Sequence, residues 1–422
     1  MRFASAIRPA LAAAPVKSPN MNDSTLTVVL TTNDDDALAP LTTQRAKSAI
    51  PFGGRFRLID FALSNCLHSD LRRILVLTQS KSHSLNKHLR DGWSVFNPQL
   101  GEYITAVPPQ MRSDSNAYRG SAHALAENWF LIERSGANYV LVVPGEQIYR
   151  MDYAAMVQAH HASGCDVTMA CVDVPNTKAS QHTRVYTNDA DKVLSLQPAM
   201  HMSPETEPVG GKSLVAMGVY VFSTSALKAA LFSNSTPVNG ITLDVLPPLI
   251  QQDAVSVYRF GGTVGRVSRD QYWRNVPTLD DYFAANMDLL EPVPPLNLYQ
   301  FGWEIRSDSS QHPPARTVSG ASGNEGICVN SLMANGAVVT GGAVSRSILY
   351  PTVQVDDGAI VENCILFHGV TVGKGASLRN CIVDKGVQIP AGTKIGEQIN
   401  ADRARFTVTP KGVVVVPSGF EF

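Results

Sequence analysis

Short apolar runs rich in β-branched residues alternate with segments of helical periodicity from Leu26 to about Leu290. The clearest strands are predicted at Leu26–Leu30, Ile74–Thr78, Tyr139–Val143, Val167–Val172 and Val215–Phe222. Helices are predicted over residues 121–135 and 151–162. This alternation is typical of an α/β fold with a largely parallel sheet. Ligands of such sheets bind beyond the carboxyl ends of the strands, so the residues that follow each strand are the candidates for a site.

The pattern changes at residues 291–297, EPVPPLN, where three prolines in four residues predict a semi-rigid connector. From about residue 326 to 396, β-branched clusters recur at near-hexapeptide spacing, as in GAIVENCILFHGVTVG. Each six-residue step places one aliphatic side chain inside and a Gly or Asn at a corner, which predicts a parallel β-helix. We therefore expect an N-terminal extension (1–20), an α/β domain (21–290), a proline-rich linker (291–325) and a β-helix domain (326–422).

Composition and charge narrow the classes of partner. The 35 Lys and Arg residues nearly cancel the 36 Asp and Glu residues, so no global field attracts nucleic acid or an anionic membrane. No apolar run approaches the roughly 20 residues that a spanning helix needs. The six cysteines are scattered without a CxxC pair, which favours free thiols in a reducing compartment over disulfides or a zinc site. We expect a cytoplasmic protein that binds neither nucleic acid nor membrane.

The first twenty residues are rich in Ala and Pro, carry Arg2, Arg8 and Lys17, and contain no acid before Asp23. Such a composition fits a disordered tail, or a stretch upstream of a start at Met21. It also fits an organelle transit peptide, which would place the protein in a plastid.

The run RAKSAIPFGGRFRLIDFALSNC at residues 45–66 resembles the N-terminal block of bacterial ADP-glucose pyrophosphorylases, which join ATP and glucose 1-phosphate. YRGSAHA at 118–124, PGEQIYRMDY at 144–153 and YWRNVPTLDDYF at 272–283 are similar to further motifs of that family. The resemblance extends from Leu26 to the C-terminus. It implies a Rossmann-like nucleotidyltransferase domain followed by a left-handed parallel β-helix, usually assembled as a tetramer.

Adenylyl transfer requires a cradle for phosphates and Mg²⁺ to neutralise charge at the reacting centre. In the family, a loop of the form GGxGxRL after the first strand supplies glycines and a phosphate-binding Arg. Here Thr32, Asn33 and Asp35 stand at the glycine positions, and Ala37 stands where the resemblance implies the Arg. Side chains at these positions block close backbone approach, and three consecutive aspartates repel phosphate. The sequence predicts weak nucleotide binding.

The other positions that the resemblance implies for catalysis are also changed. Its two metal-binding aspartates correspond to Glu146 and Asn275, and the Lys that holds the sugar phosphate corresponds to Gln197. Glu146 keeps an oxygen ligand, whereas Asn275 has lost the charge that a hard cation prefers. We therefore assign no metal site, and expect Mg²⁺ as a cofactor only if the chain is active. His123 replaces an Asp of the family's YRGTADA block.

At several polar positions the chain has the same residue type as the family. The resemblance implies nucleotide-binding roles for Lys47, Gln110, Tyr118, Arg119 and Gly120. It implies effector-binding roles for Arg45, Arg57 and Arg112. These residues predict that an anionic metabolite still binds. The family's activator-linked Lys is replaced by Gln44, which argues against activation by a sugar bisphosphate.

Three functional hypotheses follow. The leading one is a catalytically inactive or weakly active regulatory subunit of glycogen or starch biosynthesis, forming a homo- or hetero-tetramer with an ADP-glucose pyrophosphorylase. The second is an active glucose-1-phosphate adenylyltransferase with an altered site. The third is a free-standing metabolite sensor, which the β-helix disfavours because stacked coils present faces suited to subunit assembly.

Overall fold

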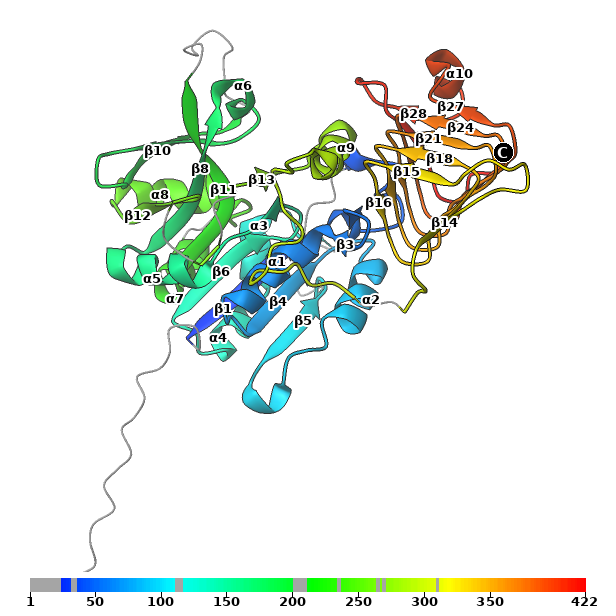
Figure 1. The fold of residues 1–422 in the computed structure, drawn as a ribbon. Coiled ribbons are helices and arrows are strands. Elements are labelled where there is room, and N and C mark those ends of the chain that lie inside the picture. The colour runs from blue at the N-terminus through cyan, green and yellow to red at the C-terminus, as the bar shows by residue number, and fades with distance from the viewer. Residues whose placement is uncertain are drawn as a thin grey trace, which may run out of the picture.

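The computed structural model describes residues 24–31, 36–110, 117–199, 211–233, 237–262, 266–267, 271–308 and 311–422. An α/β domain is followed by a stack of β-helix coils, which lies at the right of Figure 1. The aspartate-rich loop at residues 32–35 and the predicted effector residue Arg112 lie outside the described residues. In the part of the chain that is described, no helix is both long and apolar enough to cross a membrane.

The α/β domain is built on a nine-stranded sheet with the order β10-β9-β11-β6-β1-β4-β5, in which β8 pairs with β11 and β12. The strands lie at Thr25–Thr31 (β1), Arg73–Thr78 (β4), Tyr103–Val107 (β5), Tyr139–Pro144 (β6), Val167–Pro175 (β8), Arg184–Thr187 (β9), Val193–Gln197 (β10), Lys212–Ser223 (β11) and Val255–Arg259 (β12). All five strands predicted from apolar runs are confirmed.

The sheet is less parallel than the sequence pattern predicted. β6, β1, β4 and β5 are parallel neighbours, and β8 and β12 form a second parallel pair. β11, however, runs antiparallel to both β6 and β8, and β9 and β10 form an antiparallel hairpin. An apolar run reports that a strand is buried and leaves its direction open, so periodicity alone could not give this mixed arrangement.

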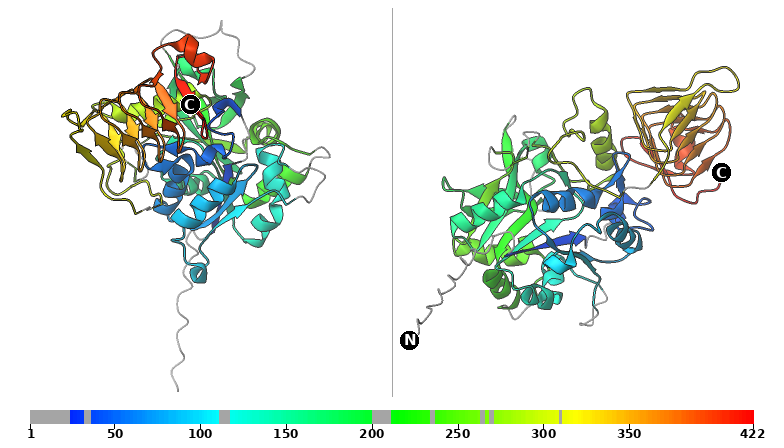
Figure 2. Two further views of the ribbon diagram at one scale, coloured as in Figure 1. Left: turned by 90° about the vertical axis from the view of Figure 1, so that its right-hand side faces the viewer. Right: turned by 60° about the horizontal axis from the view of Figure 1, so that its bottom comes forward.

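Helices cover both faces of the sheet (Figure 2). Successive β1 residues face opposite sides: Val28 packs with residues of α3, α4, α7 and α8, and Val29 packs with residues of α1, α2 and α5. The helices lie at Leu58–His68 (α1), His83–Gly92 (α2), Ser121–Glu127 (α3), Trp129–Arg134 (α4), Tyr153–Ser163 (α5), Asn176–Ala179 (α6), Thr224–Phe232 (α7), Leu246–Gln251 (α8) and Leu279–Met287 (α9).

One predicted helix is divided in two. The segment 121–135 breaks at Asn128, which lies between α3 and α4 with a backbone φ of −106°. The Asn128 side chain donates hydrogen bonds to the Ala124 carbonyl and to the Tyr118 hydroxyl. Asparagine competes for backbone hydrogen bonds in this way, which ends a helix locally. The second predicted helix, 151–162, is confirmed as α5, with Asp152 capping its first turn.

The C-terminal domain consists of three sheets, with the orders β14-β17-β20-β23-β26, β15-β18-β21-β24-β27 and β16-β19-β22-β25-β29-β28. One strand of each sheet makes a coil, as in Val338–Thr340 (β17), Ala343–Ser345 (β18) and Ile348–Leu349 (β19). The remaining strands lie at Arg316–Val318 (β14), Ile327–Val329 (β15), Leu332–Met333 (β16), Gln354–Val355 (β20), Ile360–Glu362 (β21), Ile365–Leu366 (β22), Thr371–Val372 (β23), Ser377–Arg379 (β24), Cys381–Val383 (β25), Gln388–Ile389 (β26), Lys394–Ile395 (β27), Thr407–Val408 (β28) and Val414–Val416 (β29).

The corners of the coils repeat as the hexapeptide pattern predicts. Asn330, Arg346, Asn363 and Asn380 precede the strands of one sheet at equivalent turns, all with positive φ. Asparagine tolerates this left-handed conformation better than most residues. The regular strands begin at Arg316–Val318, earlier than residue 326, because β14 pairs in parallel with β17 and closes the first coil. A short helix at Ile399–Arg403 (α10) follows the last coil.

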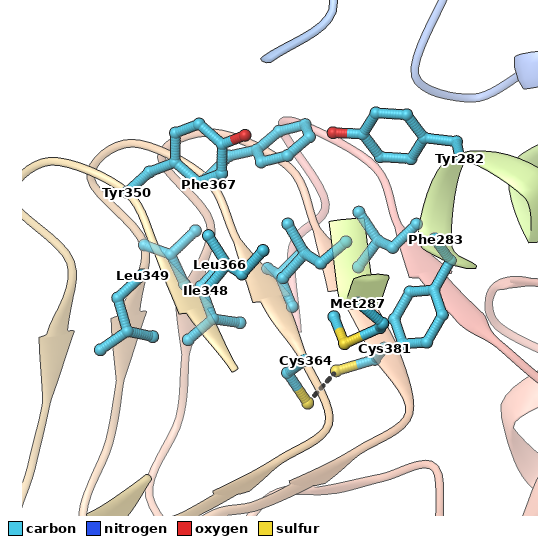
Figure 3. Packing of buried hydrophobic residues seen from close by; sticks show 14 of the residues in the cluster. Tyr282, Phe283, Met287, Ile348, Leu349, Tyr350, Cys364, Leu366, Phe367 and Cys381 are labelled. Carbon is cyan, nitrogen blue, oxygen red and sulfur yellow. Dashed lines mark hydrogen bonds between the residues drawn. The ribbon is translucent and has the colours of Figure 1, made fainter. Parts of the chain in front are cut away.

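The two domains share one hydrophobic core. Figure 3 shows Tyr282, Phe283 and Met287 of α9 packed toward Leu366 and Phe367 of the β-helix. A buried ion pair reinforces this contact. Arg45 Nη2 donates to both carboxylate oxygens of Asp384, at 2.7 and 2.8 Å, and its guanidinium lies 5.9 Å from the centre of the Phe367 ring.

We predict that Asp384→Asn lowers the free energy of unfolding by about 3–5 kcal/mol, because it leaves the buried Arg45 cation without a counter-charge. Urea denaturation followed by circular dichroism measures the change. Glu291→Gln is the matched control, since Glu291 meets Arg346 at 3.8 Å with both side chains about half exposed. The control is expected to shift stability by less than about 1 kcal/mol. Equal effects of the two variants would contradict the assignment.

Candidate functional site

The candidate site lies where the parallel strands β1 and β6 end. Gly145, directly after β6, donates its N–H to the Leu30 carbonyl at 2.9 Å. A Cβ at Gly145 would lie 2.7 Å from Thr31 Cγ2, so only glycine allows the two strand ends to approach this closely. The strand ends therefore hold Glu146, the residue after Gly145, close to the end of β1.

Lys47, for which the resemblance implied nucleotide binding, and Glu146, which stands at a metal position of the family, form an ion pair. Lys47 opens a 3₁₀ turn at Lys47–Ala49 (η2), and its Nζ lies 3.7 Å from Glu146 Oε1. Both residues are buried, with 5% and 9% of their surfaces exposed. Burial weakens screening by water, which strengthens the attraction between the two charges. Neither charge is then fully available to a phosphate or a cation.

Asn275 is brought to the same region by a small antiparallel ladder. Trp273–Arg274 (β13) pairs with Ile148–Tyr149 (β7), so the residue that follows β13 lies at the same end of the ladder as the residues that precede β7. The Asn275 Oδ1 atom accepts the N–H of Val276 at 3.0 Å. Between the two positions, the Gln147 amide is held by Met217 and Trp273 at 2.9 and 3.0 Å.

These donors do not fit a Mg²⁺ ion well. Mg²⁺ favours carboxylate and phosphate oxygens in near-octahedral geometry. The Glu146 carboxylate is already paired with an ammonium group, and Asn275 offers a neutral oxygen that is already hydrogen-bonded. Nowhere in the described ranges do three His, Cys, Asp or Glu side chains gather as a metal-binding group. We derive no step through a metal here.

The YRGSAHA segment forms a closed local network. The Tyr118 N–H donates to Gln79 Oε1 at 3.0 Å, and Arg119 Nη2 lies 3.2 Å from His123 Nε2. Burial, and secondarily the charge of Arg119, lower the pKa of His123, so its ring is neutral at pH 7. A Cβ at Gly120 would lie 2.5 Å from the carbonyl oxygen of Asn239.

That carbonyl also accepts the N–H groups of Ala122 and His123 in the first turn of α3. Donors at the start of a helix are the ones that otherwise bind phosphate. The N–H groups of Ala122 and His123 are already hydrogen-bonded within the chain and are not free to bind phosphate.

Gln197, which the resemblance places where the family holds the sugar phosphate, carries no charge. Gln197 ends β10, and its Oε1 accepts a hydrogen bond from the Tyr186 hydroxyl at 2.8 Å across the β9–β10 hairpin. His182, just before the hairpin, packs against Trp273 with ring centres 4.9 Å apart. An amide at this position hydrogen-bonds to phosphate more weakly than an ammonium group does.

The remaining predicted residues do not gather in one place. Arg45 is held in the interdomain ion pair, and Gln110 is exposed and donates to the Pro108 carbonyl. The Arg57 guanidinium binds Ser84 Oγ at 2.7 Å. Burial lowers the pKa of Arg57, against the opposing charges of two nearby aspartates. Ala37, in the 3₁₀ turn Asp36–Leu38 (η1), is exposed.

Sequence reasoning missed Asp384 as the partner of Arg45, since the two residues are 339 positions apart and no motif connects them.

A cavity of about 720 Å³ also lies apart from the candidate site, at the amino ends of β4 and β5. Its lining includes Arg72, Arg73 and Tyr103. Because ligands of open α/β sheets bind at the carboxyl ends, we keep the candidate site at β1 and β6.

The fold places the chain in the nucleotidyl transferase class, as comparison with known families shows. Residues 27–292 match the nucleotidyl transferase family, and residues 313–416 match the GlmU-like C-terminal hexapeptide family. The left-handed β-helix expected from the resemblance agrees with the second match.

The chain belongs to the glucose-1-phosphate adenylyltransferase family. It is 50% identical over 400 residues to glucose-1-phosphate adenylyltransferase 2 of Vibrio parahaemolyticus, covering 94% of this chain and 99% of the relative. The corresponding protein of Vibrio cholerae is 49% identical over 401 residues, covering 94% and 98%. Glucose-1-phosphate adenylyltransferase 1 of Alkalilimnicola ehrlichii is 43% identical over 399 residues, covering 93% of each chain.

We predict that millimolar MgCl₂ leaves the thermal unfolding midpoint of this chain unchanged, because Lys47 already compensates the Glu146 carboxylate. A ligand that binds only the folded state would raise the midpoint by mass action. Differential scanning fluorimetry with an MgCl₂ series measures the shift, and Glu146→Gln is the comparison variant. A concentration-dependent rise in the original chain that is absent in Glu146→Gln would contradict the prediction.

Proposed function

We propose that this chain is a weakly active or non-catalytic member of its family that regulates an active adenylyltransferase by assembling with it. The observation that carries the proposal is the Lys47–Glu146 ion pair at the carboxyl ends of the central strands. It joins a residue expected to bind the nucleotide to a residue expected to bind the metal. The charges of Lys47 and Glu146, which adenylyl transfer would need for its substrates, therefore attract each other instead.

The other substitutions act in the same direction. Ala37 offers no cation to the triphosphate, Asn275 offers no charge to a metal, and Gln197 offers no charge to a sugar phosphate. Removing one preorganised electrostatic donor typically lowers the rate by about 10²–10³-fold. Penalties within one site are not additive, but several together leave little turnover.

Assembly is supported by the β-helix. β15 is the edge strand of its sheet, so its outer backbone edge is open to pairing or packing. Ile327 and Val329 on β15 and Ile360 on β21 are apolar and 49%, 58% and 42% exposed. An apolar patch beside an open edge is suited to burial by another subunit. We propose a tetramer, formed from copies of this chain or together with an active relative.

Assayed alone, the purified chain is expected to make ADP-glucose from ATP and glucose 1-phosphate at least about 10³-fold more slowly than an active relative. Mixed with that relative, it is expected to co-elute on size exclusion and to change the relative's rate or effector response. Robust synthesis by the chain alone would defeat the proposal. Elution as a separate species without any change in the relative's activity would favour a free-standing sensor.

A second candidate function is an active adenylyltransferase with an altered site. The observation that favours it is that Lys47 and Glu146 both lie at the strand ends, where a nucleotide and a metal would meet. In this case Glu146 would supply the retained oxygen ligand for Mg²⁺.

Combined reversion separates the two functions. The variant Ala37→Arg, Glu146→Asp, Gln197→Lys, Asn275→Asp is expected to gain at least about tenfold in rate if the native site is inactive. Three of the changes restore charges that the family carries, and Glu146→Asp restores the family's shorter carboxylate. Gln252→Lys, which adds a charge on an exposed residue after α8, is the control and is expected to leave the rate unchanged. Substantial turnover of the original chain without any gain on reversion would support an already active enzyme.

A further inference from the structure

Cys165 and Lys192 form a close sulfur–nitrogen pair outside the candidate site. Cys165 lies in the loop between α5 and β8, and Lys192 lies just before β10. The Lys192 Nζ atom donates to Cys165 Sγ at 2.9 Å and to the Asp253 carbonyl at 2.9 Å. The Cys165 N–H is in turn held by Ser163 Oγ at 3.2 Å. The Cys165 backbone and the Lys192 ammonium group are therefore each held by a further contact.

The pair favours a thiolate beside an ammonium group. Burial acts to raise the pKa of Cys165, but hydrogen bonds from Lys192, Ser163 and Ser256 outweigh it, and the pKa is lowered. The same contact with Cys165 raises the pKa of Lys192. The thiolate is the nucleophilic and oxidisable form of cysteine.

The other cysteines have different surroundings. Burial raises the pKa of Cys66, Cys171 and Cys328. Cys66 and Cys171 are fully buried, whereas Cys165 is 6% exposed and the Lys192–Asp253 contact lies at the surface. Cys165 thus lies directly beneath the surface, within reach of a molecule as small as hydrogen peroxide. Cys328 is more exposed, and burial rather than a neighbouring amine dominates the pKa of its thiol, which makes it a suitable control.

We propose that hydrogen peroxide links Cys165 to Lys192 through a covalent bond between Sγ and Nζ. The thiolate sulfur attacks one peroxide oxygen, so that an S–O bond forms and the O–O bond breaks. The departing hydroxide takes a proton from the Lys192 ammonium group, giving water, a sulfenic acid and a neutral amine. The amine nitrogen then attacks the sulfur, the S–O bond breaks, and a second water leaves. Sulfur is oxidised by two electrons, and the peroxide is reduced.

The link would fasten the β9–β10 hairpin to the start of β8. Lys192 ends the turn of this hairpin, where its N–H binds Asn188 Oδ1 at 3.0 Å. β10 follows directly and carries Gln197, the sugar-phosphate position of the family. Oxidation is therefore expected to slow hydrogen exchange across residues 184–197. The modification itself does not depend on whether the chain is catalytic.

The test treats the reduced, full-length chain with hydrogen peroxide and maps its peptides by mass spectrometry. The expected product is a cross-linked pair of peptides containing Cys165 and Lys192, two hydrogen atoms lighter than their sum and separated by a thiol reductant. Cys165→Ser and Lys192→Arg are expected to lose it, and Cys328→Ser to retain it. Lys192→Arg preserves the cation beside the thiolate, so its Cys165 should still form a sulfenic acid that a dimedone probe captures.

Circular dichroism of each reduced variant identifies any that fail to fold, and the original chain alone still decides the question. A linked pair that retains one extra oxygen atom would overturn the direct bond between Sγ and Nζ. Oxidation of Cys165 without any link to Lys192 would overturn the proposal, as would oxidation of Cys328 while Cys165 remains reduced.

Discussion

The segment from Arg45 to Lys47 joins the two halves of this protein to each other and to the candidate site. Arg45 forms a buried ion pair with Asp384 of the β-helix, and two residues later Lys47 pairs with Glu146 at the end of β6. Breaking a buried ion pair leaves an uncompensated charge, so Arg45 is strongly held. The position of Lys47 in the site therefore depends on the packing of the β-helix against the α/β domain.

This coupling gives a physical reason why the scaffold tolerates less change than the substituted positions of the site. Leu38, Ile50 and Phe61 share one hydrophobic core with α9 and the β-helix, so substitutions there disturb both domains. Asn275 and Gln197, by contrast, are half-buried and lie outside this core. Charge can be lost at these positions while the fold and its surfaces are retained.

Much of the fold could be predicted from the sequence, because buried strands and β-helix coils leave periodic apolar patterns. The direction of β11 could not, since an apolar run carries no direction. Asn128 could be read as a possible helix breaker only once its contacts with Ala124 and Tyr118 were known. At the site, motif spacing identified Glu146 and Lys47, but it could not show that they pair with each other. That contact depends on how β6 and the segment after β1 meet in space.

Membership of the glucose-1-phosphate adenylyltransferase family therefore does not by itself determine how this particular site binds its ligands. The family fixes the architecture, whereas the local charges determine how strongly a nucleotide is held. Titration calorimetry of the purified chain with ATP and Mg²⁺ measures that property directly. Our account predicts no saturable heat of binding at submillimolar nucleotide. Micromolar binding that requires Mg²⁺ and is abolished by Glu146→Gln would contradict it.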